Sequence, residues 1–295
     1  MILNGAIAQG ITEKLAEVMG TEGKLKIVAP VSGGSINSCW QVFFNENSFF
    51  VKVNSAVSYP GMFKAEAAGL GELQSHDVIK VPDVIGEGQI DGYHFLILEW
   101  INPGRNTVQS QELFGRQLAD LHRIKHAKFG LDYNNYMGSL PQPNKLTETY
   151  TEFFIEYRLK PQVKIALAKK ILPLELERSF NILYGILGSM LDKEVFPSLV
   201  HGDLWSGNYL IDTSGVPVLI DPAISFSYRE VDIAMTTLFG GFDNRFYDSY
   251  HESFPLAKGW QERMDLWNLY PLLIHLNLFG RGYLRQIQAA LNKYV

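Results

Sequence analysis

The chain has 295 residues and a mass of 33.3 kDa, so one large domain or two lobes that share a cleft are expected. Its formal net charge of −5 and pI near 5.8 argue against a nucleic-acid surface, which needs clustered Lys and Arg. The single cysteine, Cys39, fits a reducing compartment, and a half-buried strand residue is favoured over a reactive thiol. Neither a basic leader nor ~18 uninterrupted apolar residues are found, so we expect a soluble, cytoplasmic protein with no membrane partner.

The first hundred residues predict a small antiparallel sheet with one helix, preceded by an N-terminal helix. Apolar residues recur at helical spacing over 4–19, and again over 61–73. Between these helices, β-branched and aromatic runs separated by "SGGS" and "NENS" predict strands. Two further strands, joined at Asp91-Gly92, are expected in "VPDVIGEGQIDGYHFLILEW".

After "INPGRNT", residues 101 to 107, the pattern becomes largely helical, so a boundary is predicted near residue 101. Two short strands joined by "TSG" interrupt this part, at 208–212 and 217–221. Helices are expected at about 108–125, 149–169, 173–190, 229–239 and 243–252, and in two segments after 260. The sequence therefore predicts an α+β protein with a sheet-rich first lobe and a helical second lobe.

The stretch "LVHGDLWSGNYLID" carries the clearest chemical pattern. Four residues separate Asp203 from Asn208, the spacing of a kinase catalytic loop. Such a loop uses the carboxylate to accept or orient the proton of an attacking hydroxyl, and the amide oxygen to hold Mg²⁺. Asp221 ends the next apolar run, in "VLIDPA", and is the candidate second metal ligand. Either aspartate alone could simply cap a strand end, but the set together favours phosphoryl transfer.

Nucleotide phosphates need a cation and backbone donors. Lys52 lies among apolar residues in "FFVKVN", and Glu66 in the next helix is its candidate partner, although an exposed edge-strand lysine is the alternative. Gly33, Gly34 and Ser35 lie between two strands, where their N–H groups could meet phosphate oxygens or form an ordinary hairpin turn.

Five further residues, in three places along the chain, are candidates for supporting roles. The backbone at Glu99, Trp100 and Ile101, where "LILEW" meets the connector, could bind adenine or be a buried strand end. His201 is expected to support the catalytic loop. Asp232, in "REVDIAM", either caps its helix or binds the loop backbone.

With these residues placed, the chain resembles the kinase-like phosphotransferases that include aminoglycoside and choline kinases, and most closely the fructosamine kinase (ketosamine-3-kinase) family. The resemblance is carried by "HGDLWSGN", by "DPA" followed by "YREVDIAM", by "LFGGF" and by "LYPLLIHLNLFG". It extends over nearly the whole chain when "GGSIN", "FVKVN" and "VPDVIGEG" are added. A two-lobed protein-kinase-like fold is implied, with a nucleotide-binding lobe over 1–101 and a catalytic, acceptor-binding lobe over 102–295.

The resemblance implies ATP-dependent phosphorylation of the sugar 3-hydroxyl of ketosamines, the fructosamine or ribulosamine adducts of amines or glycated proteins. It makes Asp203 the base, Asn208 and Asp221 the magnesium ligands, and Lys52 the phosphate-binding cation with Glu66 as its partner. Trp205 would present its ring to the sugar or its amine-linked portion.

Two positions depart from the family pattern, since Ser35 stands where Cys is frequent and Ser206 where Gly is common. His275, in "IHLNLFG", either lines the acceptor pocket or is a hydrogen-bonded core histidine. Two functional alternatives stay open: a kinase of the same fold that acts on an aminoglycoside, choline or another small alcohol, and a non-catalytic nucleotide-binding regulator.

Overall fold

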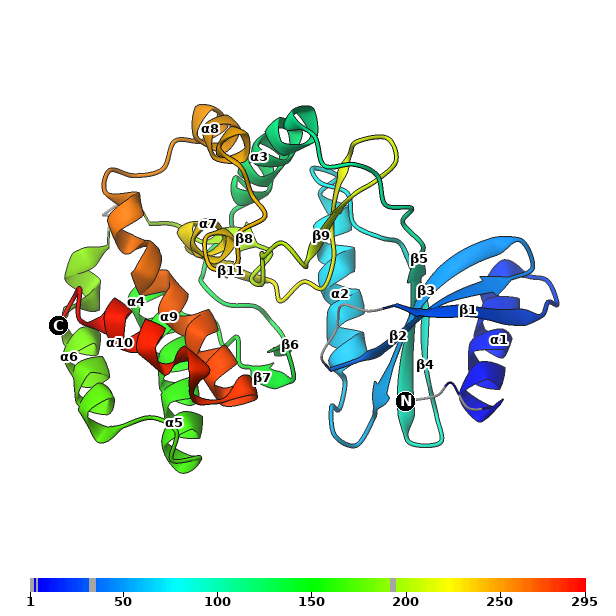
Figure 1. The fold of residues 1–295 in the computed structure, drawn as a ribbon, viewed down its shortest axis with the longest axis horizontal. Coiled ribbons are helices and arrows are strands. Elements are labelled where there is room, and N and C mark those ends of the chain that lie inside the picture. Colours follow the sequence, from blue (N-terminus) through cyan, green and yellow to red (C-terminus); the bar gives the residue numbers. More distant parts are fainter. Residues whose placement is uncertain (1–2, 4, 32–35, 192–194) are drawn as a thin grey trace. The chain divides into compact units, whose positions relative to one another are not determined.

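The computed structural model describes residue 3 and residues 5–31, 36–191 and 195–295. The chain folds into two compact units (Figure 1). Unit 1 comprises Met1–Asn106 and Leu210–Ile220, and unit 2 comprises Thr107–Tyr209 and Asp221–Val295. The helical part of the sequence is therefore interrupted by a segment that belongs to unit 1.

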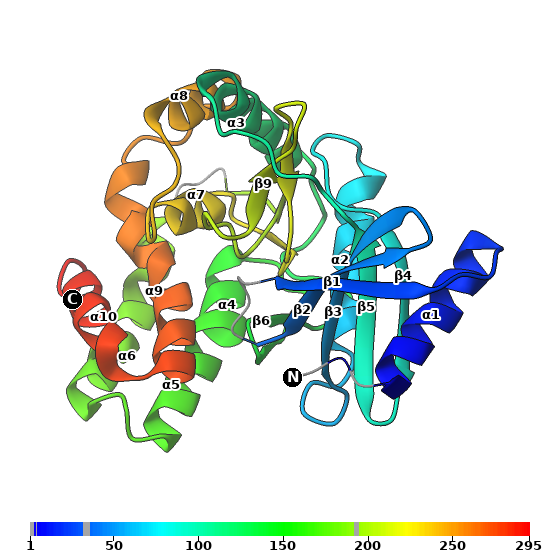
Figure 2. The ribbon, with the colours of Figure 1, turned by 45° about the vertical axis from the view of Figure 1, so that its right-hand side comes forward.

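Unit 1 contains a five-stranded antiparallel sheet in the order β1-β2-β3-β5-β4. Its elements are α1 (Gly5–Met19), β1 (Leu25–Val31), β2 (Ser38–Phe44), β3 (Asn47–Ser55), α2 (Met62–Ser75), β4 (Val84–Ile90) and β5 (Tyr93–Glu99). Figures 1 and 2 show α1 and α2 on opposite faces of this sheet, so both helices predicted in this part of the chain are present and pack on it.

The alternation of side chains along β3 decides what each face of the sheet contains. Val51 and Val53 pack with Ile7, Ile11 and other apolar residues of α1 in one buried core. Successive strand residues point to opposite faces, so the residue between the two valines is directed toward α2 instead. This is the position of the buried lysine described below.

The segment 210–220 adds a small hairpin to unit 1, formed by β9 (Tyr209–Ile211) and β10 (Pro217–Leu219). Asp212 shapes the turn, because its Oδ1 accepts hydrogen bonds from the N–H groups of Ser214 (2.8 Å) and Val216 (3.0 Å). Its Oδ2 lies 3.2 Å from Nζ of Lys80, and the Leu219 N–H donates to the Lys80 carbonyl at 2.9 Å. These contacts attach the hairpin to the rest of unit 1.

Unit 2 is mainly helical, as expected. Its helices are α3 (Val108–His122), α4 (Tyr150–Phe154), α5 (Lys160–Ala168), α6 (Leu174–Met190), α7 (Glu230–Thr236), α8 (Asn244–Ser253), α9 (Trp260–Phe279) and α10 (Leu284–Leu291), with a 3₁₀ turn at Arg281–Tyr283. The predicted helix at 149–169 is not uniform, because α4 and α5 are joined by a π-helical turn at Ile155–Leu159. Single π-helical turns occur frequently at functional sites.

Two antiparallel strand pairs in unit 2 were not predicted: β6 (Asn135–Met137) with β7 (Leu140–Gln142), and β8 (Ser198–Val200) with β11 (Ser225–Ser227). The β8–β11 pair holds both ends of the segment that contains Asp203 and Asp221. Within the described parts of the chain, no helix has the length and apolar character needed to cross a bilayer.

Candidate active site

Asp203 and Asn208 are in direct contact, as a kinase-type catalytic loop requires. Strand β8 ends just before this loop and β9 begins just after it. Nδ2 of Asn208 donates to Oδ2 of Asp203 at 2.9 Å and to the Asp203 carbonyl at 2.9 Å. Because both bonds use the amide nitrogen, the amide oxygen of Asn208 is left for a cation or another donor.

The carboxyl group of Asp203 has a strongly shifted acidity. Burial raises its pKa to about 7, with further increases from the carboxylates of Asp221 and Asp232 and an opposing effect from the Asn208 hydrogen bond. A carboxyl group with a pKa near the working pH is suited to accept a proton during a reaction. Asp221 adopts a left-handed backbone conformation with φ of 54°, which is uncommon for a residue with a side chain and is frequent at functional sites.

Asp232 binds the backbone of the catalytic loop. Its carboxylate accepts hydrogen bonds from the N–H of His201 at 2.7 Å and of Gly202 at 2.8 Å. Burial opposes ionisation of Asp232, but hydrogen bonds from His122 and from the Gly202 N–H favour the carboxylate, and its pKa is lowered. Of the two roles considered for Asp232, the loop-binding role is the one that the geometry supports.

His201 and Gly202 give the loop its shape. Nδ1 of the fully buried His201 accepts a hydrogen bond from the Asp203 N–H at 3.3 Å. Gly202 has φ of 83°, and a Cβ there would lie 2.2 Å from the carbonyl oxygen of Ala223. Glycine is therefore required, because a side chain would collide with backbone that is itself bonded to the His201 carbonyl at 2.9 Å.

The residues around Asp203 suit a hard divalent cation. Two carboxylates and an amide oxygen are the ligand types that Mg²⁺ prefers, and a cation would relieve the repulsion by which Asp221 raises the pKa of Asp203. Among the residues that the structure describes, no group of three or more His, Cys, Asp or Glu side chains could hold a metal. The candidate site thus depends on few protein ligands, which is usual for magnesium bound together with phosphates.

The two predicted substrate residues meet through a third aromatic residue. Trp205 contacts Phe239 edge-on with ring centroids 5.8 Å apart, and Phe239 lies 5.0 Å from His275. The rings of Phe279 and Tyr283 continue this aromatic cluster from His275 at 5.5 and 5.0 Å. Phe239 is 39% exposed, so the cluster reaches the surface beside the catalytic loop.

His275 has the backbone hydrogen bond expected of a core histidine, and its role in an acceptor pocket stays a prediction. Its Nδ1 lies 2.7 Å from the Pro271 carbonyl, a backbone hydrogen bond typical of a core histidine. Burial lowers the pKa of His275, and this hydrogen bond opposes the change. The neutral ring therefore donates to backbone while its face belongs to the cluster that contains Trp205.

In unit 1, Lys52 and Glu66 form the predicted pair. Nζ of Lys52 lies 2.6 Å from Oε1 of Glu66, and their side chains are only 3% and 11% exposed. The alternative of an exposed edge-strand lysine is wrong, because β3 is a central strand between β2 and β5. The candidate phosphate-binding residues Gly33, Gly34 and Ser35 lie outside the described residues.

The adenine-binding candidates keep only part of their backbone available. The Glu99 N–H donates to the Asp83 carbonyl at 2.9 Å, so it cannot also bind a base. The side chain of Trp100 is held by a bond from Nε1 to Oδ1 of Asn102 at 3.1 Å. The Glu99 carbonyl and the backbone of Ile101 remain as candidates.

Two features near Asp203 escaped sequence reasoning. Phe239 lies within "LFGGF", which matches the family pattern but predicted no role for this residue. Its contact with Trp205 joins positions that are 34 residues apart in sequence. The other is a pocket with a mixed polar and apolar lining that includes Gly202, Tyr270 and Arg158. Arg158 occupies the π-helical turn, and neither its spacing nor its neighbours in sequence connect it with the catalytic loop.

This fold, with an Asp-x₄-Asn loop followed by Asp221, defines a phosphotransferase of the kinase-like class. Residues 7–295 match the model of the family described as fructosamine kinase. The chain is 40% identical over 292 residues to a probable ketoamine kinase of Synechocystis, covering 97% of this chain and 96% of that protein. It is 33% identical to a chloroplastic protein-ribulosamine 3-kinase of Arabidopsis thaliana, covering 98% and 90%. The chain belongs to the fructosamine kinase family.

Solved structures support the same assignment. The crystal structure of a candidate fructosamine-3-kinase from Haemophilus somnus has a TM-score of 0.86 and 32% identity over 96% of both chains. A corresponding structure from Thermobifida fusca has a TM-score of 0.87 and 32% identity, covering 96% of this chain and 97% of that one. An aminoglycoside phosphotransferase, at 13% identity and a TM-score of 0.64, shares the fold. The predicted family and the α+β kinase-like fold are confirmed.

Proposed function

We propose that the protein is an ATP-dependent kinase that phosphorylates the 3-hydroxyl of ketosamines. The observation that carries this proposal is Asp203, whose pKa is raised to about 7 and whose carboxylate is bonded by Asn208, in a member of the fructosamine kinase family. Relatives at 40% and 33% identity bear the names ketoamine kinase and protein-ribulosamine 3-kinase, which supports ketosamines as the acceptor class.

In the proposed reaction, the acceptor hydroxyl attacks the γ-phosphorus of ATP while Asp203 accepts its proton, and ADP leaves. The new bond joins the sugar oxygen to phosphorus, and the bond that breaks joins phosphorus to the bridging oxygen of ADP. Asn208 and Asp232 hold Asp203 and its loop in place. Most of the rate enhancement then comes from positioning and charge neutralisation.

Residues of each unit have distinct proposed roles. Within 1–101, Lys52 binds ATP phosphates and is oriented by Glu66, and the backbone of Gly33 to Ser35 and of Glu99 to Ile101 contacts the nucleotide. Within 102–295, Trp205 and the aromatic cluster bind the acceptor. Asn208 and Asp221 would hold Mg²⁺, which when bound neutralises phosphate charge.

The acceptor is proposed to be a small ketosamine or a glycated amine on a protein. Removal of the sugar portion from the amine after phosphorylation would be a repair of glycation. The absence of a nucleic-acid partner and the cytoplasmic location remain predictions, and fractionation of the source cells tests the latter.

ATP consumption with synthetic ribulosamine and fructosamine adducts tests the proposal. We expect magnesium-dependent turnover and a product that carries phosphate on O3, identified by phosphorus NMR. Asp203→Asn should remove turnover while ATP still binds. Asp248→Asn, an exposed aspartate of the same unit, is the matched control and should keep full activity.

Two results would contradict the proposal. Turnover of aminoglycosides or choline, but of neither ketosamine, would retain the kinase and reject the acceptor. ATP binding without turnover of any acceptor would identify a regulator instead of an enzyme.

A further inference from the structure

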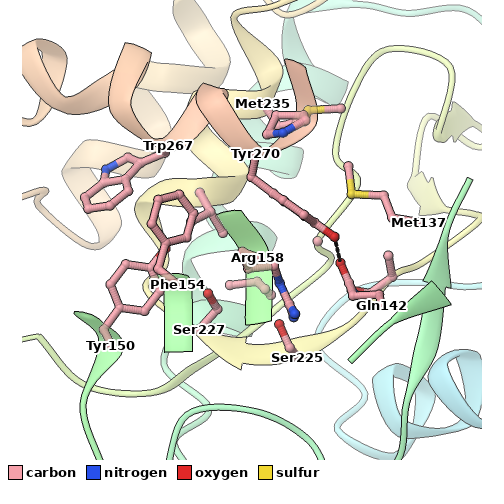
Figure 3. Close-up of a pocket in the computed structure, with 15 residues that line it drawn as sticks. Met137, Gln142, Tyr150, Phe154, Arg158, Ser225, Ser227, Met235, Trp267 and Tyr270 are labelled. Carbon is pink, nitrogen blue, oxygen red and sulfur yellow. Dashed lines mark hydrogen bonds between the residues drawn. The ribbon is translucent and has the colours of Figure 1, made fainter. Parts of the chain in front are cut away.

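A pocket in unit 2 lies directly beside the catalytic loop and contains a buried positive charge. Its lining is mixed: apolar side chains such as Met137, Met235 and Trp267 lie beside the polar residues Ser225, Ser227, Gln142 and Tyr270 (Figure 3), and Gly202 of the loop also lines it. Arg158 also lines it and is only 5% exposed. None of the lining residues is acidic.

The guanidinium of Arg158 is held by neutral oxygens. Its Nη1 donates to the carbonyls of Pro143 (2.7 Å) and Tyr157 (3.1 Å), and its Nη2 donates to Oδ1 of Asn144 at 2.7 Å. The face of Phe153 lies 4.3 Å from the guanidinium carbon. These contacts orient the cation but do not neutralise it, and no described residue supplies a carboxylate within ion-pair distance of it.

The arginine still has hydrogen-bonding capacity toward the pocket. Three of its five N–H groups are used in the bonds above, and no described residue accepts a bond from Nε. Figure 3 shows the guanidinium pointing between Ser225 and Gln142, where Gln142 accepts a bond from the Tyr270 hydroxyl at 2.7 Å. Nε2 of Gln142 donates to Oδ1 of Asn135 at 2.8 Å and to the Ala223 carbonyl at 3.1 Å, so Arg158 is the residue here that keeps N–H donors together with an uncompensated charge.

The pocket is near enough to Asp203 to take part of the acceptor. Asp203 directly follows the lining residue Gly202. Burial raises the pKa of Tyr270 to about 12, while the nearby charges of Arg158 and Asp203 act on it in opposite directions. The guanidinium carbon of Arg158 lies 5.5 Å from the centroid of the Tyr270 ring, so this ring packs against the buried cation.

The size of the pocket limits what it can hold. About 30 Å³ is open to the centres of water-sized molecules. One water needs roughly 10–15 Å³ by this measure, so the space suits about two oxygen atoms and excludes a whole sugar ring. A carboxylate presents two oxygens that an arginine can bind side by side.

We propose that this pocket binds a carboxylate on the amine portion of the acceptor, so that the protein prefers ketosamines formed from amino acids. The proposal rests on the function proposed above and deepens it. A carboxylate near Asp203 and Asp221 is repelled by both, and Arg158 offsets that repulsion. Without such a cation, an acidic acceptor would bind more weakly than a neutral one of the same shape.

Matched acceptors test the preference directly. The wild-type protein is assayed with the same ketose attached to glycine and to glycinamide, at constant ionic strength. We expect kcat/KM to be about tenfold higher for the glycine adduct, which is the effect of one additional charge-assisted hydrogen bond. Equal values would overturn the inference and leave the kinase function intact, because both adducts would still be phosphorylated.

Variants then assign the preference to the arginine. Arg158→Met should abolish the preference and keep turnover of the glycinamide adduct, whereas Arg178→Met, an exposed arginine on α6, should retain it. A preference that persists in Arg158→Met would overturn the role of Arg158. If this variant does not fold, the wild-type comparison decides alone.

Acetate distinguishes the acceptor's carboxylate from a free anion. We expect acetate to compete with the glycine adduct. Acceleration of the glycinamide adduct by acetate would assign the pocket to a free anion and overturn the acceptor assignment.

Discussion

Nε2 of His122 lies 3.2 Å from Oδ2 of Asp232, and both residues are completely buried. On its other side, Nδ1 of His122 lies 2.8 Å from the Tyr250 hydroxyl, which accepts a bond from Nη1 of Arg229 at 3.0 Å. Burial lowers the pKa of His122, although Asp232 opposes this. A neutral His122 ring accepts a hydrogen bond from the Tyr250 hydroxyl and donates one to Asp232, so each group in this series of hydrogen bonds has a partner. Asp232 is thereby held in position to bind the catalytic loop.

His122→Leu is predicted to loosen the loop. The free energy of unfolding should fall by about 2–4 kcal/mol, because Asp232 and Tyr250 lose a buried partner. Turnover should fall roughly tenfold with little change in the KM for ATP. Denaturant unfolding and steady-state kinetics measure both, with the exposed His126→Leu as control. An unchanged kcat in a destabilised protein would limit His122 to a structural role.

The raised pKa of Asp203 predicts a pH-dependent stability. The folded protein holds this proton up to about pH 7, whereas the unfolded chain releases it near 3.8, so stability falls as pH rises between these values. In metal-free protein, Asp203→Asn should therefore raise the free energy of unfolding by roughly 3 kcal/mol more at pH 8 than at pH 5. Urea titrations at both pH values measure this. An equal effect at both, as expected for Asp248→Asn, would contradict the raised pKa.

Phe239→Ala is predicted to weaken acceptor binding. The substitution removes the ring that connects Trp205 with His275. We expect the KM for the ketosamine to rise about fivefold to twentyfold, while the KM for ATP changes less than twofold. Leu174→Ala, at a residue that is 63% exposed in α6, controls for the loss of surface apolar area. A rise in both KM values would instead indicate a disturbed catalytic loop.

Lys52 and Glu66 are predicted to be unequal in their effects. Lys52→Met should lower kcat/KM for ATP by at least about a hundredfold, because a phosphate-binding charge is lost. Glu66→Gln removes the carboxylate of this buried ion pair and should cost about 3 kcal/mol of stability. Lys64→Met, an exposed lysine of α2, is the control for both measurements. ATP kinetics unaffected by Lys52→Met would remove Lys52 from the phosphate site.

Local patterns predicted the parts of the site whose residues are near one another in sequence. The spacing of Asp203 and Asn208 predicts their contact because one short loop contains both. The pairing of Lys52 with Glu66 was predicted correctly. Lys52 is a charged residue among apolar strand neighbours and needs a partner, and Glu66 lies in the helix that follows.

Contacts between distant segments could not be predicted in this way. Strands β6, β7, β8 and β11 have three residues each, too few for an alternating pattern to be recognised. The cluster around Phe239 and the pocket at Arg158 depend on how whole helices pack, and the π-helical turn that contains Arg158 is indistinguishable in sequence from ordinary helix.

The chain passes from unit 2 into unit 1 at Leu210 and returns to unit 2 at Asp221, so a metal bound near both points would restrain the segment between them. Asn208 lies two residues before the segment Leu210–Ile220, and Asp221 directly follows it. A cation held by both would act as a reversible crosslink that closes this segment into a loop, reducing the entropy of its open conformations. Binding of the metal should therefore protect the turn at Thr213 to Gly215 from proteolysis, although the turn itself contains no metal ligand.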